Sequence, residues 1–164
     1  MTWQVVDSKK ATVPDLLRAP ILFINGHQAP EFTRDEKKSL REYVDQGGSI
    51  FAESCCGRAE FDRGFRALME ELFIERQEQL RPLVDDHPIW RAKHLLSPDL
   101  HPLWGISQRG RTAVIYSPSD LSCYWNQSER SPANPAVIRA IRVGQNVIKY
   151  ATGQKLPPDK LSDP

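Results

Sequence analysis

The sequence predicts an α/β domain built as a three-layer sandwich, with a mainly parallel sheet between helices. The first observation is that short apolar runs alternate along the chain with amphipathic helical patterns, as in βαβ units. The second is that the run at residues 21–24 is apolar throughout, which is typical of a strand buried on both faces. The joints between these elements are short, and this favours right-handed parallel crossovers.

Residues 21–53 form the clearest βαβ unit. After the first strand, Thr33 and Glu36 have the spacing of a capping box at a helix start. The apolar face of this helix consists of Leu40, Tyr43 and Val44. The glycine pair at 47–48 ends the helix, and a second strand follows at residues 49–53.

The next segments predict a helix and then a hairpin. The helix has apolar residues at i, i+4, i+7, i+8 and i+11, namely Phe61, Phe65, Leu68, Met69 and Leu72. Prolines interrupt residues 74–102, so we expect only one short strand there, near Leu80. Runs at 103–106 and 112–116, joined by a turn at 108–110, predict an antiparallel hairpin.

We expect residues 1–153 to form a single domain and residues 154–164 to form a disordered tail. Within the domain, the last helix begins with Asn134 as its cap and Pro135 in its first turn. Residues 3–6 can form an additional strand at the start. Only about two predicted parallel crossovers follow it, whereas a doubly wound sheet usually has more.

Charge and hydropathy exclude some classes of partner. Lys and Arg number 22 against 21 Asp and Glu, and a net charge of +1 predicts neither nucleic-acid binding nor attraction to an anionic membrane. No apolar run approaches the ~20 residues that span a bilayer, so we expect no membrane insertion by this segment. Read as a complete protein, the chain is expected to be cytoplasmic, with its three cysteines reduced.

Three predicted strands end in loops rich in reactive and polar groups, at residues 25–27, 53–58 and 117–125. Ligands of open parallel sheets bind beyond the carboxyl ends of the strands. We therefore expect a ligand site here. Its candidate binding residues are Asn25, Gly26, Glu53, Ser54, Arg58, Asp120, Cys123 and Trp125.

Cys55 and Cys56 are candidate nucleophiles because they lie between a strand and a helix, where free amides lower a thiol pKa. His27 or His87 would be the base, and the orienting carboxylate would be Asp120 or Glu53. The flanking residues depart from the nucleophile-elbow pattern, since Glu53 stands two positions before Cys55 where glycine is usual. The alternative is that both thiols simply pack a tight turn.

The same loops also carry residues that could bind a metal ion or a ring. Zinc would take Cys55 or Cys56 together with Cys123 and a histidine, His27 or His87. Because the chain has no Cys-x-x-Cys or His-x-x-x-His spacing, we expect no metal and no resident cofactor. Glu53 and Asp120 are candidate paired carboxylates. The aromatic residues Trp104, Tyr124 and Trp125 form either a stacking platform or part of the core.

Several strings occur in an order that resembles the bacterial family called domain of unknown function 4159. They are Asn25-Gly26-His27, the helix ending in Gly47-Gly48, Phe51-Ala52-Glu53-Ser54-Cys55-Cys56-Gly57, Phe61-Asp62-Arg63-Gly64-Phe65-Arg66, Asp86-His87-Pro88-Ile89-Trp90, Pro102-Leu103-Trp104-Gly105-Ile106 and Tyr116-Ser117-Pro118-Ser119-Asp120-Leu121-Ser122-Cys123. The resemblance runs from about Trp3 to Ala151.

The resemblance implies a flavodoxin-like fold similar to class I glutamine amidotransferases and to trehalose-utilisation-type proteins. Family members often end long chains, some of them membrane-attached, which implies an upstream strand and helix and an extracytoplasmic parent. The amidotransferase triad carries over poorly. Cys55 or Cys56 falls near the nucleophile, but His101 is followed by Pro102 and Leu103 instead of the His-x-Glu pattern.

The leading hypothesis is therefore an uncharacterised amidotransferase-like domain that binds a small molecule or an upstream domain of a larger chain at the strand-end loops, without catalysis. The alternative is a thiol-dependent hydrolase or transferase that uses Cys55 or Cys56. A third reading is an assembly module of a larger envelope protein.

Overall fold

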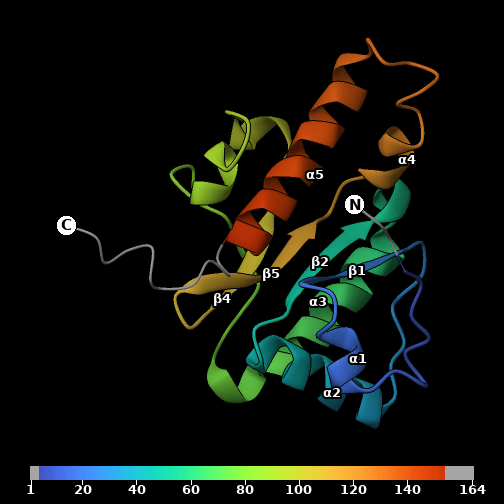
Figure 1. Cartoon of the computed structure of the whole chain (residues 1–164), viewed down its shortest axis with the longest axis vertical. Coiled ribbons are helices and arrows are strands. Elements are labelled where there is room, and N and C mark those ends of the chain that lie inside the picture. Colours follow the sequence, from blue (N-terminus) through green and yellow to red (C-terminus); the bar gives the residue numbers. More distant parts are fainter. Residues whose placement is uncertain (1–3, 154–164) are drawn as a thin grey trace.

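A five-stranded sheet forms the centre of the computed structural model, which describes residues 4–153 (Figure 1). The strands are β1 (Ile21–Gly26), β2 (Ser49–Ser54), β3 (Arg81–Pro82), β4 (Trp104–Gln108) and β5 (Arg111–Ser117), in the spatial order β1-β2-β5-β4-β3. The helices are α1 (Val13–Leu16), α2 (Arg34–Asp45), α3 (Ala59–Phe73), α4 (Ser122–Trp125) and α5 (Pro135–Gly153). The chain is α/β, as the alternation of patterns predicted.

The sheet is mixed, so the expectation of a mainly parallel sheet is not confirmed. β1, β2 and β5 run parallel, but β4 is antiparallel to both β5 and β3. The cause is the turn between β4 and β5, where Arg109 (φ 50°) and Gly110 (φ 75°) both have positive φ. Consecutive positive φ values give the type I′ turn that reverses the chain in two residues. The predicted βαβ unit and hairpin are both confirmed.

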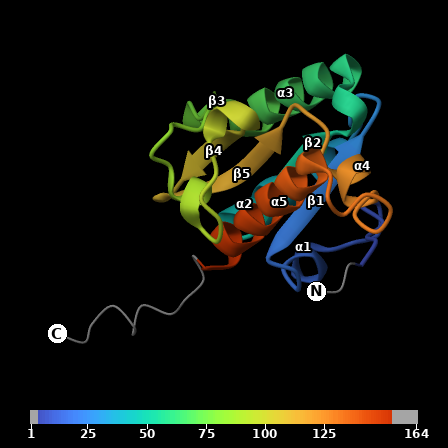
Figure 2. The same cartoon turned by 90° about the horizontal axis from the view of Figure 1, so that it is seen from above.

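Helices cover the two faces of the sheet, and Figure 2 shows α3 and α5 on opposite sides of it. Alternate residues of β2 point to different faces: Ile50 and Ala52 pack in the cluster with α2 and α3, whereas Phe51 packs in the cluster with α5. All five apolar positions predicted for α3 are buried. The capping box of Thr33 and Glu36 is present at the start of α2.

β1 does not have the two buried faces that its apolar sequence indicated. It ends the strand order, and the side chains of residues 21–24 are only half-buried. Leu22 and Ile24 pack against the core cluster on one face of the sheet, and Ile21 and Phe23 pack against the cluster on the other face. Residues 4–6 are exposed and lie outside every strand, while Trp3 and the expected disordered tail at 154–164 fall outside the described residues.

Residues 84–103 form an irregular segment that packs against α5. Asn146 of α5 is buried there: its side-chain oxygen accepts from the backbone of Lys93 and His94, and its amide donates to the carbonyl of Ile89. At the start of α5, the Asn134 side chain accepts from the backbone of Ala136, as predicted for its cap. Within residues 4–153, no helix has the length and apolar character that crossing a bilayer requires. The single-domain assignment stays a prediction.

We predict that Gly48→Ala destabilises the protein by about 1–3 kcal/mol, since a Cβ there overlaps the ring of Tyr43. This ring cannot move away easily, because it is fully buried and its hydroxyl donates to the carbonyl of Ala19. Urea denaturation measures the change. The control is Gly153→Ala, which meets no atom within 4 Å; equal stabilities of the two variants would contradict the prediction.

Candidate functional site

Glu53 is a fully buried carboxylate that joins the three loops at the carboxyl ends of β1, β2 and β5. Its Oε2 accepts hydrogen bonds from the backbone N–H groups of Leu121 (2.6 Å) and Ser122 (2.9 Å). Its Oε1 accepts from the side-chain amide of Asn25 (3.4 Å). These bonds replace the water that a buried charge loses, and they fix α4 beside the turn that follows β2 (Figure 1).

The three cysteine sulfurs meet at this edge of the sheet and form what we call the thiol triangle. The Sγ atoms of Cys55 and Cys56 are 3.6 Å from that of Cys123, and 3.9 Å from each other. All three are free thiols. Cys56 and Cys123 are 67 residues apart in the sequence, so the turn after β2 and the helix α4 together present three soft donor atoms to one point.

A tight turn positions the thiols of Cys55 and Cys56. Cys55–Gly57 form a 3₁₀ turn between β2 and α3, and the Ser54 hydroxyl closes it by donating to the carbonyl of Arg58 (2.8 Å). Within the turn Cys56 has a φ of 56°, a left-handed conformation that costs a non-glycine residue on the order of 1 kcal/mol. The backbone holds this strained conformation where the exposed Cys56 thiol joins the triangle.

Cys123 is positioned by Asp120, whose carboxylate accepts from its backbone N–H (3.2 Å). A carboxylate oxygen of Asp120 also lies within 4.8 Å of the sulfurs of Cys55 and Cys123. Burial, and then the hydrogen bond to Asp120, raise the pKa of the Cys123 thiol. Burial is also the main cause that raises the pKa of Cys55. Neither environment is that of an activated thiolate nucleophile.

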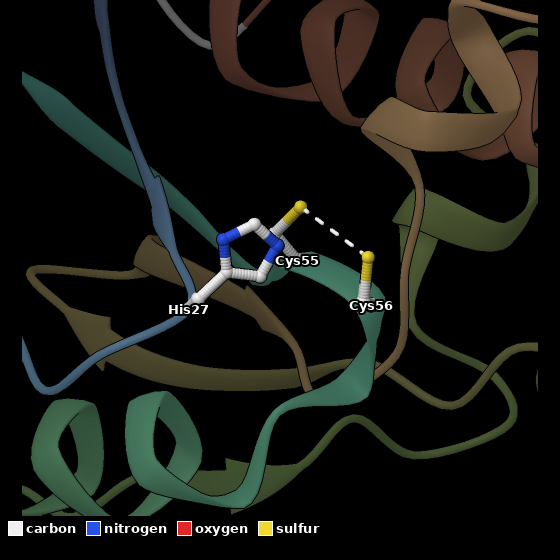
Figure 3. Close-up of side chains that lie close together, drawn as sticks. All are labelled: His27, Cys55 and Cys56. Carbon is white, nitrogen blue, oxygen red and sulfur yellow. Dashed lines mark hydrogen bonds between the residues drawn. The ribbon is translucent and has the colours of Figure 1, made fainter.

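His27 is the one predicted histidine that the structure brings to the thiols. It is exposed in the loop after β1, and a ring nitrogen lies within 4.8 Å of the sulfurs of Cys55 and Cys56. Figure 3 shows the ring beside Cys55. Behind this loop Gly26 lets the chain pass close to Phe61, whose ring carbon would be 3.2 Å from an added Cβ.

The structure places the other predicted base, His87, at the opposite end of β5. Its Nε2 donates to the hydroxyl of Thr112 (2.9 Å), because its Nδ1 accepts from the backbone of Ile89 (3.2 Å). Burial lowers the pKa of His87. These bonds fix the irregular segment on the sheet, and they leave His87 remote from the thiol triangle.

The aromatic candidates do not form a platform at the site. Trp125 packs on α5, where its Nε1 donates to the carbonyl of Ala140 (2.9 Å). Trp104 is stacked under the guanidinium of Arg66, whose Cζ is 4.2 Å from the ring centroid. Both tryptophans thus have structural contacts. Arg58, which was predicted to bind a ligand, is exposed at the start of α3.

His101 is a site residue that the sequence analysis missed. Ser117, at the end of β5, donates to the carbonyl of Ser119 (2.6 Å), so the Nε2–H of His101 donates to the Ser117 oxygen (2.8 Å). Burial, helped by the charge of Arg139 and opposed by Asp120, lowers the pKa of His101 to about 4. The neutral imidazole holds the turn that carries Asp120. Only its place three residues before β4 hinted at this role, since nothing in the neighbouring sequence marks the contact.

We predict that Glu53→Gln lowers the free energy of unfolding by about 1–3 kcal/mol, because a neutral acceptor replaces a charged one at the buried N–H of Leu121 and the partly buried N–H of Ser122. Chemical denaturation measures the loss. The control is Glu70→Gln, an exposed carboxylate on α3, for which we expect a change within about 0.5 kcal/mol. A Glu53→Gln protein as stable as this control would refute the role of Glu53.

We predict that acid destabilises the protein through His101. Its folded pKa of about 4 is below the usual 6.5, so the folded state binds fewer protons in that range. This contribution to stability is complete above about pH 6.5 and is lost as the pH falls towards 4, by up to about 3 kcal/mol. Denaturation of wild type and His101→Gln across this range tests it. The variant should show a shallower pH dependence, and parallel curves would contradict the assignment.

Comparison with known proteins gives one result that covers almost the whole described chain. A search of curated proteins found no match. The family described as Domain of unknown function (DUF4159) matches residues 4–152, a range that includes the thiol triangle, His27, Glu53 and His101. The chain therefore belongs to the DUF4159 family.

Proposed function

We propose that this chain is a small-ligand-binding module whose ligand contacts the thiol triangle, and that it is not an amidotransferase-type hydrolase. The observation that carries this proposal is the convergence of three sulfur atoms within 3.9 Å of one another at the carboxyl ends of the parallel strands. Sites beyond such strand ends are the usual ligand sites of open α/β sheets.

The arrangement favours binding over catalysis because its carboxylate is already occupied. Oε2 of Glu53 accepts two hydrogen bonds and Oε1 accepts one, and the residue is fully buried, so its carboxylate is not accessible to a substrate. Glu53 thus acts as a positioning residue. Such a preformed site lowers the entropic cost of holding a ligand.

We also propose that the parallel part of the sheet is related to the flavodoxin-like fold of class I glutamine amidotransferases and trehalose-utilisation-type proteins. The support is local: Cys55 and Cys56 follow the strand β2, in a tight turn before α3, near the nucleophile position of the amidotransferases. The antiparallel pairing of β4 with β5 and β3 is where the present sheet departs from a parallel one.

A thiol-dependent hydrolase or transferase is the second candidate, and His27 is the observation in its favour. Its imidazole lies within 4.8 Å of the sulfurs of Cys55 and Cys56. However, among residues 4–153 no hydrogen bond joins His27 to a thiol, and none orients its ring. A base needs both, although both can form when a substrate binds.

Phenylarsine oxide is a suitable probe of the proposed site, since its arsenic bonds to two neighbouring thiols and its oxygen leaves as water with their two protons. We expect the native protein to bind one molecule per chain and to lose this binding in the Cys55→Ser/Cys56→Ser double variant, which keeps a single thiol. We expect no hydrolysis of L-glutamine or p-nitrophenyl acetate above the rate of the same variant. A native protein inert to the arsenical, or turnover that disappears in the variant, would overturn the proposal.

A further inference from the structure

We infer that the ligand of this site is a zinc ion, bound by the thiol triangle and by an imidazole nitrogen of His27. The inference rests on the proposed binding function and names its ligand. It departs from the expectation of a metal-free site, which rested on the missing Cys-x-x-Cys spacing. In the folded chain the ligands come from the loop after β1, the turn after β2 and α4, so their spacing along the sequence carries no signal.

The size of the thiol triangle fits one tetrahedral ion. Three sulfurs bound tetrahedrally at a Zn–S length of about 2.3 Å lie about 3.8 Å from one another. The three sulfur–sulfur distances in the structure are 3.6, 3.6 and 3.9 Å. An ion placed over the triangle can therefore reach all three sulfurs without a rearrangement of the backbone.

A shared ion explains the triangle better than a disulfide does. A disulfide would bring two sulfurs to about 2.05 Å and leave the third without a role. The sulfur of Cys123 instead lies at the same distance from Cys55 as from Cys56. A metal ion bonded to all three sulfurs would hold them at such similar distances from one another. Thiolates are also the protein ligands that zinc and other soft ions prefer.

His27 is the better fourth ligand because its exposed ring makes no hydrogen bond to another of residues 4–153, whereas the Asp120 carboxylate already accepts one. The Asp120 carboxylate accepts from the backbone of Cys123 and so holds one corner of the triangle. The His27 ring is exposed and lies within 4.8 Å of two of the sulfurs. A rotation of this side chain completes a Cys₃His set, one of the standard donor sets of tetrahedral zinc sites.

The strained backbone at Cys56 supports the same role. A left-handed non-glycine residue is retained where the surrounding structure requires it, and such residues concentrate at binding sites. Here the left-handed conformation of Cys56 places its sulfur in the triangle. Bonds from zinc to the thiols would offset the energy of this conformation. On binding, each thiol becomes a thiolate and its proton passes to solvent, with no change of oxidation state.

Cobalt(II) is the direct spectroscopic probe of this site. Added to the metal-free, reduced protein, one equivalent should produce thiolate-to-cobalt charge-transfer absorption and the strong visible bands of a tetrahedral ion, and zinc should displace it at a ratio of one per chain. Zinc should also protect all three cysteines from iodoacetamide. The protection is measured in wild-type protein, so it does not depend on how any variant folds.

Single substitutions assign the ligands. Cys55→Ser, Cys56→Ser and Cys123→Ser should each weaken zinc binding on the order of 100-fold. His27→Ala should shift the visible cobalt bands, since water replaces nitrogen. The remote His94→Gln should leave the bands in place; the His94 ring instead contacts Gln145. Bands that stay unshifted in His27→Ala would overturn the assignment of His27.

The two proposals fail differently. If phenylarsine oxide binds one per chain but cobalt gives only the weak spectrum of the hydrated ion, the zinc inference is wrong and the binding site stands. If neither binds, the thiols are not accessible as a group, and both proposals are wrong. If zinc binds equally well in all three cysteine variants, its site lies elsewhere and the zinc inference is wrong.

Discussion

The buried carboxylate of Glu53 is the constraint on which the site depends. A charge at 0% exposure is tolerable only when hydrogen bonds replace its hydration, and here the donors come from the end of β1 and from the start of α4, which follows β5. Satisfying one carboxylate therefore fixes three strand ends relative to one another. Because Cys55 follows Glu53 closely and Cys123 follows Leu121, the same bonds that stabilise the charge bring the thiols together.

The mixed sheet gives this arrangement its rigidity. The parallel strands β1, β2 and β5 present their carboxyl ends at one edge, and the hairpin of β4 and β5 anchors the other end of the sheet. Both faces are packed, by α2 and α3 on one side and by α5 on the other. Loops carried on such a scaffold have little freedom, which is what a binding site of three or four donor atoms requires.

Much of this arrangement follows from the sequence, and the exceptions have physical reasons. Capping residues, helix periodicity and the turn at Gly110 are local signals, so α2, α3, α5 and the hairpin were predicted correctly, whereas the four-residue helices α1 and α4 were not predicted. The half-burial of β1 was not predicted, because a short apolar run can form either an edge strand or a central strand of a sheet. The loops of the site were identified from the strand-end rule. The contacts of Glu53, His101 and Cys123 join residues far apart in the chain, and a single sequence does not show them.

X-ray absorption at the zinc K-edge of the zinc-loaded protein is the most direct test of the thiol triangle as a zinc site, because it reports the donor atoms and their distances together. We predict three sulfurs at about 2.3 Å and one nitrogen at about 2.0–2.1 Å from the ion. A first shell made only of nitrogen and oxygen would show that the thiol triangle does not hold the ion.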